Sequence, residues 1–257
     1  MADEFVDPLN PDPTPRKKLV LFFLIDTSGS MTGSKIGQVN QAVEEALPKI
    51  RNLGGSDADI YFAPIVFGEK VEWVYESPQS VETARWDRIS ANGMTPLGAA
   101  FREVNKKMSR AAYLTSPHGS FAPVVFLLTD GYPNDDWITG LKLLKNNKWF
   151  KKALKIAVGV GNDADMDMLR QFVNDPELAI MLTNGENLSK LIQFILVTSS
   201  EIGSQSLGFE DDDSEDDNTS DNDTDEESKE NKAKTQAMVD QVKNFKSEDF
   251  DQINDGF

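Results

Sequence analysis

The stretch KLVLFFLIDTSGS, residues 18–30, decides the fold of this chain. It begins with a continuous apolar run and ends in an acid, Asp26, that is followed by small hydroxyl and glycine residues. A short apolar run bounded by turn residues is typical of a strand buried on both faces of a parallel sheet. We therefore predict a central strand over 18–26 whose carboxyl end carries Asp26, Ser28 and Ser30.

The same alternation of apolar run and helical pattern continues along the chain. Apolar positions between Ile36 and Ile50 recur at spacings of three and four, which predicts a helix. Further runs predict strands at 59–68, 71–75, 123–130, 154–161 and 179–183, with helices between most of them. Repeated strand, crossover and helix indicate an α/β fold with a doubly wound, mostly parallel sheet, one short antiparallel edge strand and helices on both faces.

The acidic residues divide the chain into regions. Residues 210–230 hold thirteen Asp or Glu against one lysine, a composition typical of disorder. We predict a flexible segment at 1–17, one α/β domain at 18–205, a disordered acidic linker at 206–231 and a tail at 232–257. The tail is expected to be disordered, to form a short helix around AKTQAMVDQVKNF, or to act as a short interaction motif through its apolar residues.

Composition narrows the classes of function. The chain has 257 residues, 43 Asp and Glu against 26 Lys and Arg, and no cysteine. A net charge of −17 repels nucleic acid and anionic membrane surfaces, so neither is an expected partner. The lack of cysteine excludes disulfides and thiolate metal sites and suits a reducing compartment. With no long apolar span and no signal-peptide pattern at its start, the protein is expected in the cytoplasm.

Hydroxyls and carboxylates from three distant segments should meet at one edge of the sheet. They are Asp26, Ser28 and Ser30 after the first strand, Thr95 in the loop GMTPLG, and Asp130 after the strand PVVFLLT. In an open α/β sheet, ligands bind outside the carboxyl ends of the strands. Oxygen donors without a soft ligand suit Mg²⁺, with Mn²⁺ as the alternative, and disfavour zinc.

This constellation resembles a known one. Asp26-x-Ser28-x-Ser30, Thr95 in GMTPLG and Asp130 in LLTDG match all five positions of the metal-ion-dependent adhesion site of von Willebrand factor A domains. The order of strands and helices over 18–205 is similar to that family too. Within it, TSGSM, GMTPLG and LLTDGYPND look most like the bacterial subgroup associated with tellurium resistance. One departure is Met94, where that loop often has glycine.

The resemblance implies a role for each of these residues. Ser28, Ser30 and Thr95 would offer hydroxyl oxygens to the ion, while Asp26 and Asp130 would act largely through bound waters. An ion so weakly neutralised would attract an Asp or Glu carboxylate of a protein partner to its open position. The resemblance thus implies metal-mediated protein binding without catalysis, beside kinase or phosphatase components of a bacterial stress response. We also expect Thr95 to cap a helix that starts at Pro96.

Two alternatives remain open at this point. A Mg²⁺-dependent phosphotransferase or hydrolase of the haloacid dehalogenase type also begins with an apolar strand ending in Asp, but it needs a second Asp where this chain has Ser28. A scaffold whose metal site stays empty is the other alternative. The chain's own acidic segment at 210–230 is a further hypothesis, because a tethered carboxylate could compete with partners for the metal.

Other polar residues have plainer explanations. Asp135 and Asp136, and the group Asp163, Asp165 and Asp167, each precede a predicted helix, where capping and the helix dipole account for them. The one histidine, His118, lies in a loop of turn-forming residues and is interpreted as solvated. No site role follows for any of them.

Overall fold

The computed structural model describes residues 16–52, 58–116, 118–182, 187–204 and 223–249. Its described strands form one sheet in the order β3-β2-β1-β5-β6-β7. The central strands are β1 (Lys17–Asp26), β2 (Ala58–Phe67), β5 (Val124–Thr129) and β6 (Leu154–Val160), and β7 (Ala179–Leu182) closes one edge. Neighbouring pairs among these five run parallel. The prediction of a mostly parallel α/β sheet is therefore confirmed.

The antiparallel part of the sheet lies on the outer side of β2. The predicted edge strand is β3 (Val71–Trp73), which pairs antiparallel with the end of β2. A second short segment, β4 (Gln79–Ser80), also pairs antiparallel with β2, and its two residues carry too little pattern to be predicted. Edge segments as short as these offer another chain little backbone for pairing.

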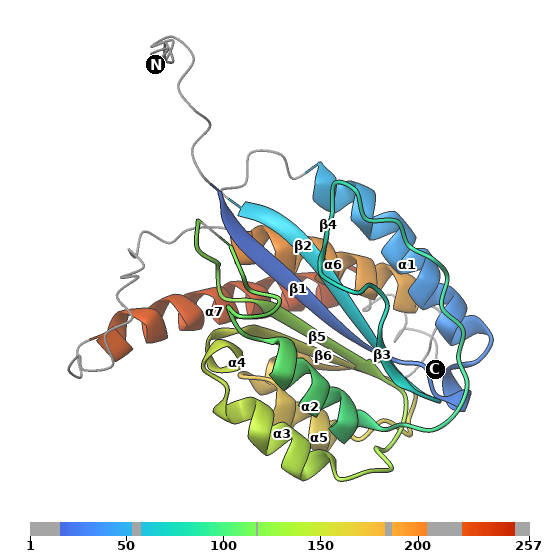
Figure 1. Ribbon diagram of the computed structural model, residues 1–257. Coiled ribbons are helices and arrows are strands. Elements are labelled where there is room, and N and C mark those ends of the chain that lie inside the picture. Colours follow the sequence, from blue (N-terminus) through green and yellow to red (C-terminus); the bar gives the residue numbers. More distant parts are fainter. Residues whose placement is uncertain (1–15, 53–57, 117, 183–186, 205–222, 250–257) are drawn as a thin grey trace, which may run out of the picture.

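Helices cover both faces of the sheet, as Figure 1 shows. Helix α1 (Ser34–Arg51) packs beside α6 (Leu188–Ser204) on one face. Helices α2 (Leu97–Lys107), α3 (Trp137–Asn146) and α5 (Met166–Phe172) gather on the other, where Phe101 of α2 stacks on Phe172 of α5. The remaining short helices are α4 (Lys148–Lys152), η1 (Gly29–Met31) and η2 (Pro176–Leu178).

The core explains why the apolar runs become strands. Every residue from Leu19 to Ile25 is at most 2% exposed, and Phe23 stacks on Phe126 of β5 with ring centroids 4.6 Å apart. Such a strand needs apolar residues on both faces because helices cover both. Among the described residues, no helix combines the length and apolarity that a membrane crossing requires.

Helix α7 (Asp223–Asp249) extends the folded part beyond residue 205. Its Met238, Val239 and Val242 are buried, and the ring of Phe245 stacks on that of Phe194 in α6 at 4.3 Å. Of the predicted acidic linker, residues 206–222 lie outside the described part of the chain, and residues 223–231 belong to α7. Of the three expectations for the tail, disorder, a short helix or an interaction motif, the helix describes residues 233–245, and it packs on the chain's own domain.

Helix α7 runs antiparallel to α6. The ammonium of Lys234 lies 3.5 Å from the carbonyl oxygen of Gly203, near the end of α6, whereas Phe245 contacts Phe194, earlier in α6. A Cβ on Gly203 would meet Leu19 and Val124, at the start of β1 and β5. The end of α6 and the beginning of the docked part of α7 therefore lie at the amino-terminal edge of the strands.

Candidate metal centre at the carboxyl edge of the sheet

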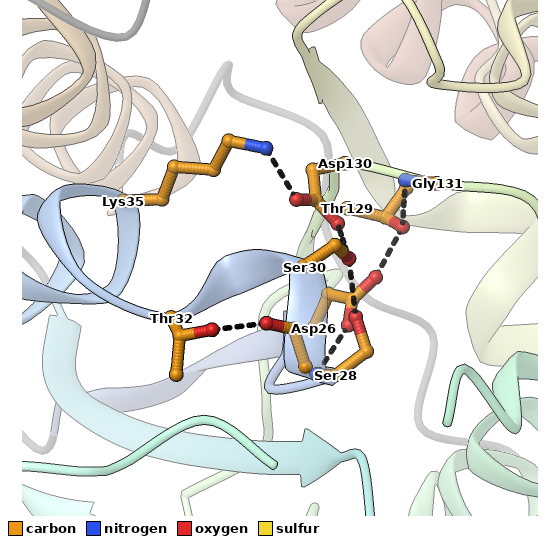
Figure 2. A network of polar contacts seen from close by, with 9 residues as sticks. Asp26, Ser28, Ser30, Thr32, Lys35, Thr129, Asp130 and Gly131 are labelled. Carbon is orange, nitrogen blue, oxygen red and sulfur yellow. Dashed lines mark hydrogen bonds and ion pairs between the residues drawn. The ribbon is translucent and has the colours of Figure 1, made fainter. Parts of the chain in front are cut away.

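The carboxylate of Asp26 is fixed at the end of β1. It is fully buried, its Oδ1 accepts a hydrogen bond from the backbone N–H of Ser28 at 2.8 Å, and its Oδ2 accepts one from the Thr129 hydroxyl at 2.5 Å (Figure 2). The first bond shapes the turn after β1, and the second joins β1 to β5. Burial raises the pKa of the Asp26 carboxyl above its usual range, while the hydrogen bonds from Ser28 and Thr129 oppose that rise.

A second group of contacts links the first loop to Asp130. The hydroxyls of Ser28 and Ser30 lie 3.0 Å apart, and the Ser30 hydroxyl donates to Oδ1 of Asp130 at 2.7 Å. The ammonium of Lys35, in the first turn of α1, donates to Oδ2 of the same carboxylate at 2.5 Å. Figure 2 shows these side chains converging from the end of β1, the end of β5 and α1. Four of the five predicted site residues thus lie in one network.

The fifth residue, Thr95, is brought to this edge by backbone hydrogen bonds of the residues that precede it in its loop. The N–H of Gly29 donates to the carbonyl of Gly93 at 3.0 Å, and that of Asn92 donates to the carbonyl of Thr27 at 2.7 Å. These bonds hold the loop before α2 against the loop after β1. Gly93 has a φ of 90°, and a Cβ there would lie 2.4 Å from the backbone nitrogen of Glu69, so only glycine fits.

The helix cap expected at Thr95 is supplied by a different residue. Helix α2 begins at Leu97, and its N-cap position, Pro96, forms no side-chain cap. The carboxylate of Asp135 accepts hydrogen bonds from the N–H groups of Gly98 and Ala99, both at 2.8 Å. The expectation that Thr95 caps a helix beginning at Pro96 was therefore wrong, because a carboxylate from the β5–α3 segment occupies that end of the helix.

Capping explains two of the other aspartates, as predicted. Asp136 accepts from the N–H of Thr139 at the start of α3, and Asp165 accepts from that of Met168 at the start of α5. Asp135 also caps, but on the neighbouring helix α2. Side-chain oxygens at these positions satisfy N–H groups that have no partner within the helix.

Sequence reasoning gave no role to Lys35 or Thr129, which complete the network. Thr129 stands next to Asp130 in the sequence, but its partner, Asp26, lies 103 residues away. Lys35 had no local signal, because its partner lies 95 residues away. Both contacts depend on the strand order of the folded sheet.

The donor atoms of this network suit a hard ion. The Ser28 and Ser30 hydroxyls lie 3.0 Å apart, and the Ser30 hydroxyl lies 2.7 Å from the Asp130 carboxylate. Oxygen ligands are those that Mg²⁺ takes in proteins. Within the described ranges, no group of three or more His, Cys, Asp or Glu gathers to hold a metal. A metal at this edge would therefore depend on hydroxyls in addition to the two carboxylates.

Comparison with curated proteins finds relatives for part of the chain. A heavy chain H1 of inter-alpha-trypsin inhibitor from Bos taurus is 31% identical over 156 residues, which cover 57% of this chain and 17% of that protein. Heavy chain H2 from Homo sapiens is 27% identical over 183 residues, covering 66% of this chain and 18% of that protein. The chain therefore spans less than a fifth of the length of these relatives.

Solved structures share the fold at low identity. A von Willebrand factor type A protein from Catenulispora acidiphila matches with a TM-score of 0.52 and 17% identity, covering 73% of this chain and 43% of that one. Proximal thread matrix protein 1 from the mussel byssus, in a form with zinc in its metal-ion-dependent adhesion site (MIDAS) motif, matches with a TM-score of 0.52 and 16% identity. The match covers 70% of this chain and 48% of that one. The family model of the von Willebrand factor type A domain matches residues 21–194. This chain therefore belongs to the von Willebrand factor type A domain family.

Proposed function

We propose that this domain is a metal-dependent protein-binding module. Ser28, Ser30 and Thr95 would hold a Mg²⁺ or Mn²⁺ ion with their hydroxyl oxygens, and Asp26 and Asp130 would support it through waters. The bound ion supplies an electrophilic position for one carboxylate oxygen of a partner. The observation that carries the proposal is the convergence of Asp26, Ser28, Ser30 and Asp130 in one network of oxygen donors at the carboxyl edge of the sheet.

The residues of the chain prepare this position in distinct ways. Asp26 is held by Ser28 and Thr129, so its carboxylate is oriented in advance. Ser30 connects the first loop to Asp130 at the end of β5. An ion bound by the loop would therefore lie close to the Asp130 carboxylate. The zinc in the mussel protein's MIDAS motif supports a divalent ion here, and the all-oxygen donor set favours Mg²⁺ or Mn²⁺ over zinc.

The carboxylate that completes the site would come from a protein partner, and the acidic segment at 210–230 is a competitor to test. The end of α6 lies near the amino-terminal edge of the strands, because a Cβ on Gly203 would meet Leu19. Seven residues separate Leu19 from Asp26, so the site lies about 23 Å further along β1. About eight extended residues cover that distance, so one of the segment's carboxylates could compete with a partner.

Binding is preferred over catalysis because of position 28. A phosphotransferase of the haloacid dehalogenase type needs a second carboxylate there, whereas the Ser28 hydroxyl lies against Ser30. The resemblance to the tellurium-linked subgroup makes kinase or phosphatase components of a bacterial stress response the partners to test first.

A second candidate, a scaffold that uses no metal, has one observation in its favour. The ammonium of Lys35 lies 2.5 Å from Oδ2 of Asp130, so a cation of the chain itself already neutralises that carboxylate. In this alternative, the network would hold the loop and the sheet together without an ion. Metal titration separates the two candidates.

Water-proton relaxation of Mn²⁺ tests the open coordination position. Mn²⁺ bound to the protein should enhance the relaxation rate, and a peptide acetyl-Gly-Asp-Gly-amide should lower that enhancement by replacing a bound water. The asparagine peptide, acetyl-Gly-Asn-Gly-amide, should have a much smaller effect, and Ser30→Ala should abolish the initial enhancement. Equal effects of both peptides, or an unchanged enhancement in Ser30→Ala, would contradict the proposal.

A further inference from the structure

The exposed apolar side chains of this domain gather beside the candidate metal centre. Among the described residues, the large apolar side chains left exposed are Met94, Tyr132, Ile138 and Leu143. Met94 and Tyr132 are 64% and 66% exposed, and Ile138 is 64% exposed. Single exposed apolar residues need no explanation, but their concentration in one part of a surface marks an interaction site.

Backbone contacts place three of these residues around the same edge. Met94 precedes Thr95, and the neighbouring Gly93 accepts a hydrogen bond from Gly29 of the first loop. Tyr132 follows Asp130 by two residues. The N–H of Asn134 donates to the carbonyl of Thr95 at 3.1 Å, which ties the segment after β5 to the loop before α2.

Ile138 joins this group because α2 and α3 begin side by side. A Cβ on Gly98, in the first turn of α2, would lie 2.4 Å from the carbonyl oxygen of Asp136, just before α3. Ile138 is in the first turn of α3, whereas Leu143 lies further along the helix. Met94, Tyr132 and Ile138, here called the apolar rim, thus flank the carboxyl edge where Asp130 and Thr95 lie.

Charge narrows the kind of partner that suits this rim. Carboxylates outnumber cations at this edge: Glu69, Asp135 and Asp136 lie there beside Asp130, with Arg102 paired to Asp136 and Lys35 to Asp130. These carboxylates would repel a polyacidic ligand, whereas a ligand with a single carboxylate would lose little binding free energy to the repulsion. Affinity beyond the single metal–carboxylate contact must then come from apolar area.

We infer that the apolar rim selects a partner segment in which one Asp or Glu stands next to bulky apolar side chains, in a stretch without further acids. The acid occupies the open position at the metal, and its apolar neighbours pack on Tyr132, Ile138 and Met94. This inference rests on the proposed function and adds the specificity that a bare metal–carboxylate contact lacks.

Fluorescence polarisation with three labelled peptides tests the inference on the full chain in Mn²⁺. The first peptide is Gly-Ser-Leu-Asp-Phe-Ser-Gly, the second replaces its Leu and Phe by glycine, and the third is hexaglutamate. Burial of about 50 Å² of apolar surface should make the first bind about fivefold to tenfold more tightly than the second. Hexaglutamate should bind more weakly than the first.

Variants assign the preference to the rim. The double variant Tyr132→Ser/Ile138→Ser should remove most of the advantage of the Leu-Asp-Phe peptide and leave the glycine-flanked peptide unchanged. Leu143 is also exposed and lies in α3 with Ile138, but further from the site. Leu143→Ser should therefore change the affinity of neither peptide. These side chains are exposed, so the fold should persist, and thermal unfolding of each variant verifies it.

The outcomes distinguish failure of the apolar rim from failure of the proposed function. Equal binding of the apolar-flanked and glycine-flanked peptides, both abolished by chelator, would overturn the apolar rim and leave the proposed function standing. Tightest binding of hexaglutamate would also overturn the rim. Binding of the first peptide that persists in chelator, or no binding of any peptide, would overturn both the inference and the proposed function.

Discussion

Lys35 and Asp130 form an ion pair in which the ammonium lies 2.5 Å from a carboxylate oxygen whose side chain is fully buried. The other oxygen of that carboxylate accepts a hydrogen bond from Ser30. A single acid thus faces a cation of the chain on one side and the candidate metal position on the other. Charge at Lys35 should therefore oppose a second cation at this edge.

Removal of the Lys35 charge should strengthen metal binding. Because two cations repel each other at short range, Lys35→Met is expected to raise the affinity for Mn²⁺ by about fivefold to tenfold at low ionic strength, and less at high salt. Calorimetric titration measures this change. Lys49→Met, near the other end of α1, serves as the control and should leave the affinity unaltered. Weaker Mn²⁺ binding in Lys35→Met would show that the ammonium supports the site.

Asp135 should contribute more to stability than its neighbour Asp136. It accepts two N–H groups of α2, whereas Asp136 accepts one at the start of α3 and is exposed. Loss of a capping carboxylate costs about 1–2 kcal/mol, so Asp135→Ala should lower the free energy of unfolding by about that amount. Urea denaturation of both alanine variants checks this order. Equal losses would argue that the long-range cap is unimportant.

The contact between α2 and α3 should tolerate no side chain at Gly140. A Cβ there would lie 2.6 Å from the carbonyl oxygen of Gly98, so Gly140→Ala should destabilise the domain by about 1–3 kcal/mol. Gly37→Ala is the matched control, because Gly37 also lies in a helix but a Cβ there meets nothing within 4 Å. That variant should gain about 0.5–1 kcal/mol. Similar unfolding midpoints for both variants would contradict the close packing.

The predictions from sequence succeeded where the signal was local. The run from Leu19 to Ile25 identified a strand buried on both faces, and the polar residues that follow it and β5 indicated the edge where Asp26, Ser28, Ser30 and Asp130 meet. Parallel strands place their carboxyl ends at one edge, so this convergence follows from fold class alone.

What failed or was missed depends on contacts between distant segments. The α2 cap comes from Asp135 and not from Thr95, because the segment after β5 crosses the start of α2. Lys35 joins Asp130 only after β1 and β5 are paired. Helix α7 has few apolar residues, and only their burial in the folded domain shows that Met238, Val239 and Val242 form a packing face.

Lys155 gives the domain a predictable response to pH. It is buried in β6, where its ammonium donates to the carbonyl of Ala153 at 3.1 Å and to Asn174 at 2.7 Å, and burial lowers its pKa to about 7. The unfolded chain keeps the ordinary value of 10.5 and binds more protons between these two values. Stability should therefore rise with pH across that window, because the cost of burying a charged lysine disappears as the folded state loses its proton.

Comparison with Lys155→Met isolates this contribution. From pH 7 to 9, the unfolding free energy of the wild type should rise relative to that of Lys155→Met by at most about 1.4 kcal/mol per pH unit. Lost hydrogen bonds shift the variant's curve by a constant amount and do not change this slope. Chemical denaturation at several pH values provides the measurement, and parallel curves for the two proteins would contradict the assignment.

Calorimetric titration of the intact chain with Mg²⁺ and Mn²⁺ tests the central claim most directly. The wild type should bind one ion of either metal, and Ser30→Ala should lose that binding because the hydroxyl that joins Ser28 to Asp130 is gone. Thr32→Ala, in the same loop but bonded to the carbonyl of Gly29, should retain it. A wild type that binds neither metal, or a Ser30→Ala variant that binds as the wild type does, would contradict the account.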